Sequence, residues 1–205
     1  MIAVQWIDRS DNSIASQLGG GWRLRRAASR ALLTETIDAF GVGPYSVRRE
    51  LGRRPVLDPA THHFSMSHSG NLTVCAVAER NVAVDVELLG TARAIRLSES
   101  PPARFFTEKE LRSITADPAR LVHLFTLKEA WSKYGGIGLG IGLGSFDEQS
   151  IRAQHEHVEF SAVNLPGAAC TVCHHADETL IVQARALSAS QVNAAEVTDR
   201  RERTQ

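Results

Sequence analysis

Residues 64–87 read FSMSHSGNLTVCAVAERNVAVDVE, and this stretch decides much of the fold. The run Leu72 to Ala78 is apolar and β-prone, Glu79-Arg80-Asn81 has the composition of a turn, and Val82 to Val86 is apolar again. The sequence therefore predicts a β-hairpin across residues 72–86, preceded by the end of another strand and the polar turn SHSG.

The flanking segments predict helices and further strands. A helix is expected from Trp22 to Phe40, where Gly41 and Gly43 stop it, and another from Leu121 to Tyr134, which ends at Gly135-Gly136. Thr107 and Glu110 have the spacing of a capping box at the start of an intervening helix. Strands are expected at residues 2–7, 45–51, 158–163, 169–174 and 180–186.

This order of elements predicts an α+β fold with two similar lobes, because a helix followed by strands occurs both early and late. The expected divisions are an N-terminal lobe at 1–98, a C-terminal lobe at 99–188 and a frayed polar tail at 189–205.

Composition limits the classes of function. The 205 residues are 43% hydrophobic, with 23 basic and 23 acidic side chains, so there is no bulk basic field to attract nucleic acid. Three cysteines argue against a disulfide framework. The N-terminus lacks a signal-peptide pattern, and no apolar run is long enough to span a membrane. These features favour a cytoplasmic, reduced protein.

Asp85 and Glu87 lie one residue apart in the expected strand VAVDVEL, so both carboxylates should point to the same side. Adjacent acids repel each other unless a cation lies between them. Mg²⁺ takes one or two protein carboxylates together with phosphates and water. The pair is therefore a candidate Mg²⁺ site, and the plain alternative is a polar strand end.

The helix FTLKEAWSKYGG (125–136) carries a second charged group. Glu129 and Lys133 are four residues apart and share a helix face, with Lys128 adjacent. The acid could complete a metal site and the lysines could hold phosphate oxygens. An ordinary solvated i,i+4 pair is the alternative.

Further phosphate-binding candidates are His68 with its flanking serines and the arginines at 23–30 and 53–54. The same arginines could equally face an acidic partner. A Ser–His hydrolase is disfavoured because the chain contains no G-x-S-x-G elbow.

Four segments in this order resemble the phosphopantetheinyl transferases of the surfactin-synthetase-activating type: FSMSHSG (64–70), VAVDVE (82–87), RFFTEKE (104–110) and FTLKEAWSKYGGIGLG (125–140). LGRRP (51–55) fits the family's basic G-x-P element. The resemblance implies two lobes related by a pseudo-twofold axis, a monomer, and transfer of 4′-phosphopantetheine from coenzyme A to a serine of an apo acyl or peptidyl carrier protein.

The resemblance also implies residue roles. Asp85, Glu87 and Glu129 match the acids that hold Mg²⁺, although Mn²⁺ would suit the same oxygens. Glu129 and Lys133 are the expected catalytic residues, with Glu129 removing the serine proton directly or through a metal-bound water. The expected contacts to coenzyme A are Arg30, Arg54, Ser67, His68, Asp85, Lys128 and Lys133. Glu110 matches an acid near the site.

The sequence departs from the family pattern at Ala83, where a glycine is usual, and at Ile137, where a polar residue is usual. Two rival functions stay open. The run Cys170 to His174 formally matches a C-x-x-C-H haem attachment motif. A non-catalytic coenzyme A or carrier-protein binder on the same fold is the second rival.

Overall fold

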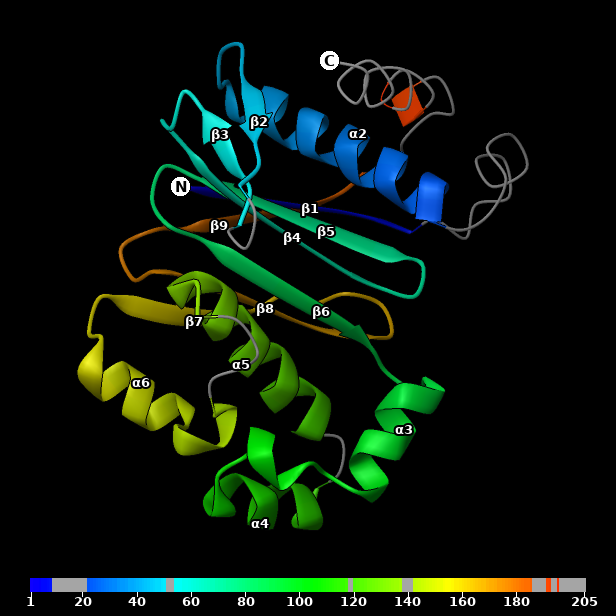
Figure 1. Ribbon diagram of the computed structural model, residues 1–205, viewed down its shortest axis with the longest axis vertical. Coiled ribbons are helices and arrows are strands. Elements are labelled where there is room, and N and C mark those ends of the chain that lie inside the picture. Colours follow the sequence, from blue (N-terminus) through cyan, green and yellow to red (C-terminus); the bar gives the residue numbers. More distant parts are fainter. Residues whose placement is uncertain are drawn as a thin grey trace.

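The computed structural model describes residues 1–8, 22–50, 54–117, 120–137, 142–185, 191–192 and 195. They form two larger sheets, each covered by one long helix, and a two-stranded ribbon, with shorter helices around the second sheet (Figure 1). The mixture of helices and sheets confirms the predicted α+β class. None of the helices in these ranges has the length and apolar character needed to cross a bilayer.

The first sheet has the strand order β4-β5-β1-β9. Its members are β1 (Ile2–Asp8), β4 (His63–Ser69), β5 (Leu72–Ala78) and β9 (Leu180–Ala184), and β1 pairs antiparallel with β5 but parallel with β9. The helix α2 (Trp22–Phe40) lies across one face. It buries an alanine- and leucine-rich stripe there: Ala27, Ala28, Ala31, Leu32 and Ile37.

The second sheet has the strand order β6-β8-β7 and is antiparallel throughout. It consists of β6 (Ala83–Leu88), β8 (Ala168–His175) and β7 (Val158–Ala162). The helix α5 (Arg120–Gly135) packs on it, and buried residues occur on most of its sides because neighbouring elements surround it.

Shorter elements complete the two halves. Beside the first sheet is a two-stranded ribbon of β2 (Ser46–Arg48) and β3 (Val56–Asp58). Around α5 lie α3 (Ala92–Glu99), α4 (Glu108–Ala116), α6 (Glu148–Gln154) and the 3₁₀ turns η1 (Ala103–Phe105) and η2 (Leu143–Ser145). The capping box predicted for Thr107 and Glu110 is confirmed at the start of α4. The helices α3 and α6 were not predicted from the sequence.

The two sheets pack face to face through a shared apolar core. Ile2, Val4 and Val74 of the first sheet meet Val84 and Val172 of the second, and all five are completely buried. The edge strands β4 and β6 also lie side by side, and side chains link them: Ser65 Oγ accepts a hydrogen bond from Val84 N at 3.1 Å. This contact places the SHSG segment beside the acids of β6.

The predicted hairpin is wrong in its pairing. The hairpin is β4–β5, joined through Gly70 and Asn71, and Gly70 has the positive φ of 53° that such a tight turn requires. After β5 the chain leaves the first sheet, and β6 pairs with β8 instead. Alternation within a strand predicts its faces but does not identify its neighbour.

Both sheets therefore cross the expected boundary at residue 98. The second sheet contains β6 from the first half of the chain, and the first sheet contains β9 from the second half. The expected frayed tail lies largely outside the described residues. Val192 within it, however, is completely buried against α2, so this part of the tail belongs to the core.

Candidate active site

A cavity of about 490 Å³ lies between α5, the edge strand β4 and the segment around Arg54. It brings together three residues predicted from sequence, Arg54, Glu129 and Lys133. The remaining lining residues are Arg49, Pro55, Phe64, Ser65, Met66, Ser132 and Gly136. The side chains of Arg49 and Arg54 thus line the same cavity as the Glu129 carboxylate and the Lys133 ammonium of α5. Three cations around one cavity suit an anionic ligand.

Lys133 links the cavity to the acids of β6. Its Nζ donates to Asp85 Oδ1 at 2.7 Å and to the backbone carbonyl of Val84 at 3.0 Å. The Lys133 side chain keeps a third of its surface exposed, whereas that of Asp85 keeps 7%. Asp85 is therefore shielded behind an ammonium group that itself reaches the cavity.

Serines of β4 hold both carboxylates of β6. Ser67 Oγ donates to Asp85 Oδ1 and Ser69 Oγ donates to Glu87 Oε2, each at 2.7 Å. Ser69 Oγ also accepts a hydrogen bond from Leu88 N at 3.0 Å. Ser67 is buried, and its hydroxyl serves a carboxylate here, in place of the phosphate contact that the resemblance implies.

His68 projects from the opposite face of β4 to Ser67, as successive residues of a strand do. It shares that face with Phe64 and Met66, both of which line the cavity. The His68 side chain is exposed and lies outside the lining set.

Arg54 is held at the cavity by the turn between β5 and β6. Its Nη2 donates to Asn81 Oδ1 at 2.6 Å and contacts His63 Nδ1 at 3.2 Å, while Asn81 Nδ2 donates to the carbonyl of Tyr134 on α5 at 2.9 Å. Burial lowers the pKa of His63, and the nearby Arg54 charge lowers it further. A neutral His63 ring can accept the hydrogen bond from the guanidinium.

Arg30 lies away from this cavity. It lines a second hollow of about 430 Å³ between α2 and β2, together with Thr34, Tyr45 and Gln191. The structure therefore does not bring Arg30 to Glu129 and Lys133. Arg23 and Arg53, two other arginines of the predicted basic groups, have side chains outside the described residues.

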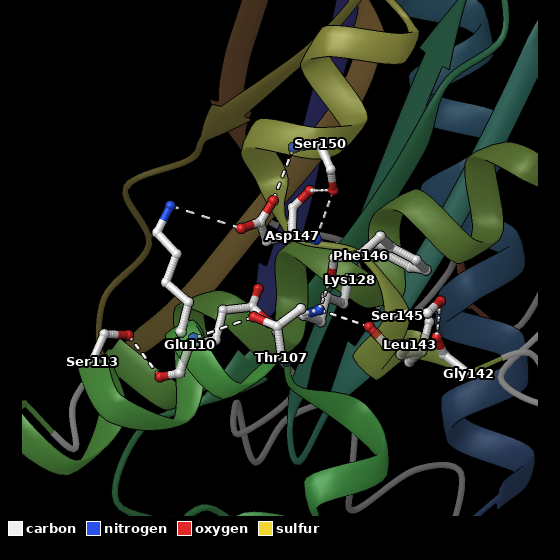
Figure 2. Close-up of polar contacts among 11 residues, drawn as sticks. Thr107, Glu110, Ser113, Lys128, Gly142, Leu143, Ser145, Phe146, Asp147 and Ser150 are labelled. Atoms are coloured by element: carbon white, nitrogen blue, oxygen red, sulfur yellow. Dashed lines mark hydrogen bonds and ion pairs between the residues drawn. The ribbon is translucent and has the colours of Figure 1, made fainter.

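The expected contact of Lys128 with coenzyme A does not fit its position. Its side chain is 1% exposed and forms an ion pair with Glu110 at 2.9 Å (Figure 2). Its ammonium also donates to the backbone carbonyls of Leu143 and Phe146. Three acceptors use the three N–H donors of an ammonium group, so none is left for a ligand.

The predicted three-acid metal cluster is not assembled. Within the described ranges, no three side chains of the His, Cys, Asp or Glu type are arranged to hold a metal ion. Asp85 is bonded to Lys133 and Ser67, Glu87 is bonded to Ser69, and Glu129 lines the cavity. The donor chemistry still suits Mg²⁺, because this ion is usually held by one or two carboxylates with substrate phosphates rather than by a complete protein cage.

The C-x-x-C-H motif lies inside β8 and does not form a haem site. Cys170 packs between the two sheets, whereas Cys173 packs under α5, so the two sulfurs face opposite sides of the strand. Burial raises the pKa of Cys170 to about 12 and raises that of Cys173 as well. His174 is buried and hydrogen-bonded to Ser161.

Two residues of the site, Arg49 and Asn81, were not predicted from the sequence, and Ser69 was predicted as a phosphate contact, not as the partner of Glu87. Ser69 carried a usable signal, because Ser65, Ser67 and Ser69 alternate along one strand and should share one face. Arg49 and Asn81 carried none, since Arg49 takes part only as a lining residue of the cavity and Asn81 reaches the site through its hydrogen bond with Arg54.

Known proteins match this chain in sequence over much of its length. The profile of the 4′-phosphopantetheinyl transferase superfamily matches residues 81–189, more than half of the chain. The chain is 34% identical over 100 residues to the 4′-phosphopantetheinyl transferase psf-1 of Bacillus pumilus, covering 46% of this chain and 41% of that protein. It is 28% identical over 136 residues to a 4′-phosphopantetheinyl transferase of Bacillus subtilis, covering 62% and 58%.

A third relative is the 4′-phosphopantetheinyl transferase Sfp of Bacillus subtilis strain 168, 29% identical over 103 residues, with 48% of this chain and 44% of that protein covered. The matches to these three relatives thus span about two fifths to three fifths of their length. The matched region includes both β6 acids, the whole of α5 and the second sheet. The chain belongs to the 4′-phosphopantetheinyl transferase superfamily.

Proposed function

We propose that this protein transfers the 4′-phosphopantetheine group of coenzyme A to a serine of an apo acyl or peptidyl carrier protein and releases 3′,5′-ADP. The observation that carries this proposal is the cavity in which Glu129 and Lys133 share one wall, with Arg54 close by and Asp85 bonded to Lys133. Such a combination of one acid with several cations suits a pyrophosphate and a hydroxyl nucleophile.

In the proposed reaction, the carrier serine oxygen forms a bond to the β-phosphorus of the pyrophosphate. The bond from that phosphorus to the bridging oxygen breaks, and 3′,5′-ADP leaves. Glu129, which is half-buried on the cavity wall, accepts the serine proton. The Lys133 ammonium, already at the cavity, donates to a phosphate oxygen and offsets its charge.

Phosphoryl transfer of this kind depends more on positioning and charge neutralisation than on covalent help from the protein. Asp85, Glu87 and Glu129 are the candidates to hold Mg²⁺, or Mn²⁺ with the same oxygen ligands, one or two of them together with the substrate phosphates. The ion, when bound, supplies positive charge to the pyrophosphate oxygens. Arg49 and the N–H groups of Arg54 that Asn81 and His63 do not use would bind further phosphate oxygens.

The proposal includes a monomeric enzyme that works in the cytoplasm and docks acidic carrier proteins through its arginines. Exposed charge pairs are screened by salt. Added salt should therefore weaken turnover of a whole carrier protein more than turnover of a short serine peptide.

The deciding experiment is intact-mass analysis of a panel of apo carrier proteins incubated with coenzyme A and Mg²⁺. We expect a mass gain of one phosphopantetheine group on at least one carrier, and none on the same carrier with its acceptor serine replaced by alanine. Binding of coenzyme A without any mass gain across the panel would show a non-catalytic binder and overturn the proposal.

A further inference from the structure

Lys128 is the neighbour of Glu129 in sequence, yet the two side chains have different surroundings. Successive residues of an α-helix are rotated by about 100°, so one can face the interior of the lobe while the next faces the cavity. Glu129 and Lys133 are four residues apart and share the cavity side. Lys128 points instead toward α4 and η2, as Figure 2 shows.

Glu110 connects Lys128 to the start of α4. Its Oε2 accepts hydrogen bonds from Thr107 N at 2.7 Å and from Thr107 Oγ1 at 3.0 Å, and the same oxygen forms the ion pair with Lys128. Glu110 is buried, and its Oε1 has no hydrogen-bond partner among the described residues. This carboxylate therefore depends on the Lys128 ammonium for compensation of its charge.

The remaining two donors of Lys128 hold the chain where it returns from the end of α5. They bond the carbonyls of Leu143 in η2 and of Phe146 just after it, and the Phe146 ring centre lies 4.8 Å from Nζ. Between them, Gly144 lies so close to η1 that an added Cβ would be 3.0 Å from the carbonyl oxygen of Ala103. Because η1 leads directly into α4, the Lys128 ammonium connects α5 both to α4 and to η2.

We propose that Lys128 is a positioning residue for the candidate active site. By fixing α5 against α4 and η2, it sets where Glu129 and Lys133 stand on the cavity wall. Lys128 contacts neither substrate in this proposal and acts only through the helix. The proposal rests on the proposed function, because the effect of misplacement is read as phosphopantetheine transfer.

The test compares Lys128→Met, Glu110→Gln and the double variant, with Lys109→Met as the matched control. Glutamine preserves the capping box of α4, so Glu110→Gln removes the charge alone. Lys109 is next to Glu110, but its side chain is 68% exposed, and its contacts with Asp147 at 3.8 Å and Gln149 at 2.9 Å lie at the surface. Kinetics are measured with coenzyme A as the varied substrate, and Tm is measured for each variant.

We expect Lys128→Met to lower kcat about tenfold to a hundredfold, the size of effect that misplacing a reacting group by about 1 Å produces. The KM for coenzyme A should change by no more than about twofold, because no ground-state contact is lost. Glu110→Gln should lower kcat in the same way, and the double variant should be no worse than Lys128→Met, because both substitutions break one unit. Lys109→Met should behave as the unchanged protein does.

Two outcomes would overturn the proposal. A raised KM in Lys128→Met with normal kinetics in Glu110→Gln would make Lys128 a direct ligand of coenzyme A. A lower Tm in both variants with unchanged kcat below that Tm would leave Lys128 a role in stability alone.

Hydrogen exchange supplies a readout that needs no activity, and it also covers the case in which Lys128→Met fails to fold. In Glu110→Gln, the amides of residues 120–137 and 142–147 should exchange faster than in the unchanged protein, whereas those of β1 and β5 should not. Unchanged exchange in α5 would overturn the positioning role even if no carrier is modified. A protein that transfers nothing but shows the faster exchange would refute the proposed function alone.

Discussion

The two sides of α5 hold a lysine each, and the two environments differ in almost every respect. Lys128 is buried, and three protein oxygens occupy its donors. Lys133 keeps a third of its side chain exposed, bonds Asp85 and the carbonyl of Val84, and lines the cavity. Both belong to the same K-E-A-x-x-K element, so the motif alone does not distinguish a structural cation from one that a ligand can reach. Burial and the occupancy of the N–H donors make that distinction.

The largest expected loss of activity follows from neutralising Glu129, on the cavity side of α5. Glu129→Gln should lower kcat by at least about a hundredfold, since a positioned proton acceptor contributes on that scale. Its Tm should stay close to that of the unchanged protein. The fully exposed Glu108, with its pair to Arg112, gives the matched control Glu108→Gln. Normal activity of the Glu129→Gln variant would contradict the proposal that Glu129 accepts the serine proton.

A smaller effect, on stability, is expected for Asp85 of β6, which contacts Lys133 of α5. Asp85→Asn takes the charged partner from Lys133 and weakens the acceptor of Ser67, so the free energy of unfolding in urea should fall by about 1–3 kcal/mol. The control is Asp177→Asn, which alters an exposed pair with Arg80 and should change stability much less. Equal losses in the two variants would mean that the Asp85–Lys133 contact is no stronger than a surface pair.

The smallest expected effect is a pH dependence of stability caused by His63, which contacts Arg54 at the cavity. Burial and the Arg54 charge lower the pKa of His63, with Glu178 opposing, so the unfolded chain takes up the proton before the folded protein does. Stability from this group is complete above the usual histidine pKa of about 6.5 and is lost as the pH falls below it. The stability advantage over His63→Gln should therefore shrink between pH 7.5 and pH 5.5 in urea unfolding. An advantage that is constant across this range would contradict the neutral role of His63.

Local sequence patterns predicted where helices and strands form better than they predicted which of these elements lie next to each other. The stripe of α2 and the glycine stop of α5 depend on residues close in sequence, and both helices were confirmed. The pairing partner of β6 is β8, which lies eighty or more residues later in the chain, and the predicted hairpin was wrong. Val192 shows the same limit, because its polar surroundings in sequence conceal its burial against α2.

The candidate site shows this limit at the level of single residues. Acid and base on one helix face, Glu129 and Lys133, follow from helical periodicity, and the structure places both on the cavity. The burial and hydrogen bonding of Lys128 depend on Glu110, eighteen residues before it, and on Leu143, fifteen residues after it. Helical periodicity contains no information about such contacts, so a buried role and an exposed one looked the same.

The exchange of strands between the sheets has a consequence for how the chain reaches its native state. Because β9 returns to β1, residues 2–6 find their parallel partners only at residues 180–184. Pairings so distant in sequence slow folding, since a large loop must close before the contact is made. During synthesis, β1 and β5 can pair early, but one side of β1 stays open until almost the whole described chain has emerged from the ribosome. Assembly of the first sheet is thus completed last at its own first strand, and until then that strand presents an unpaired edge, the kind of edge that promotes aggregation.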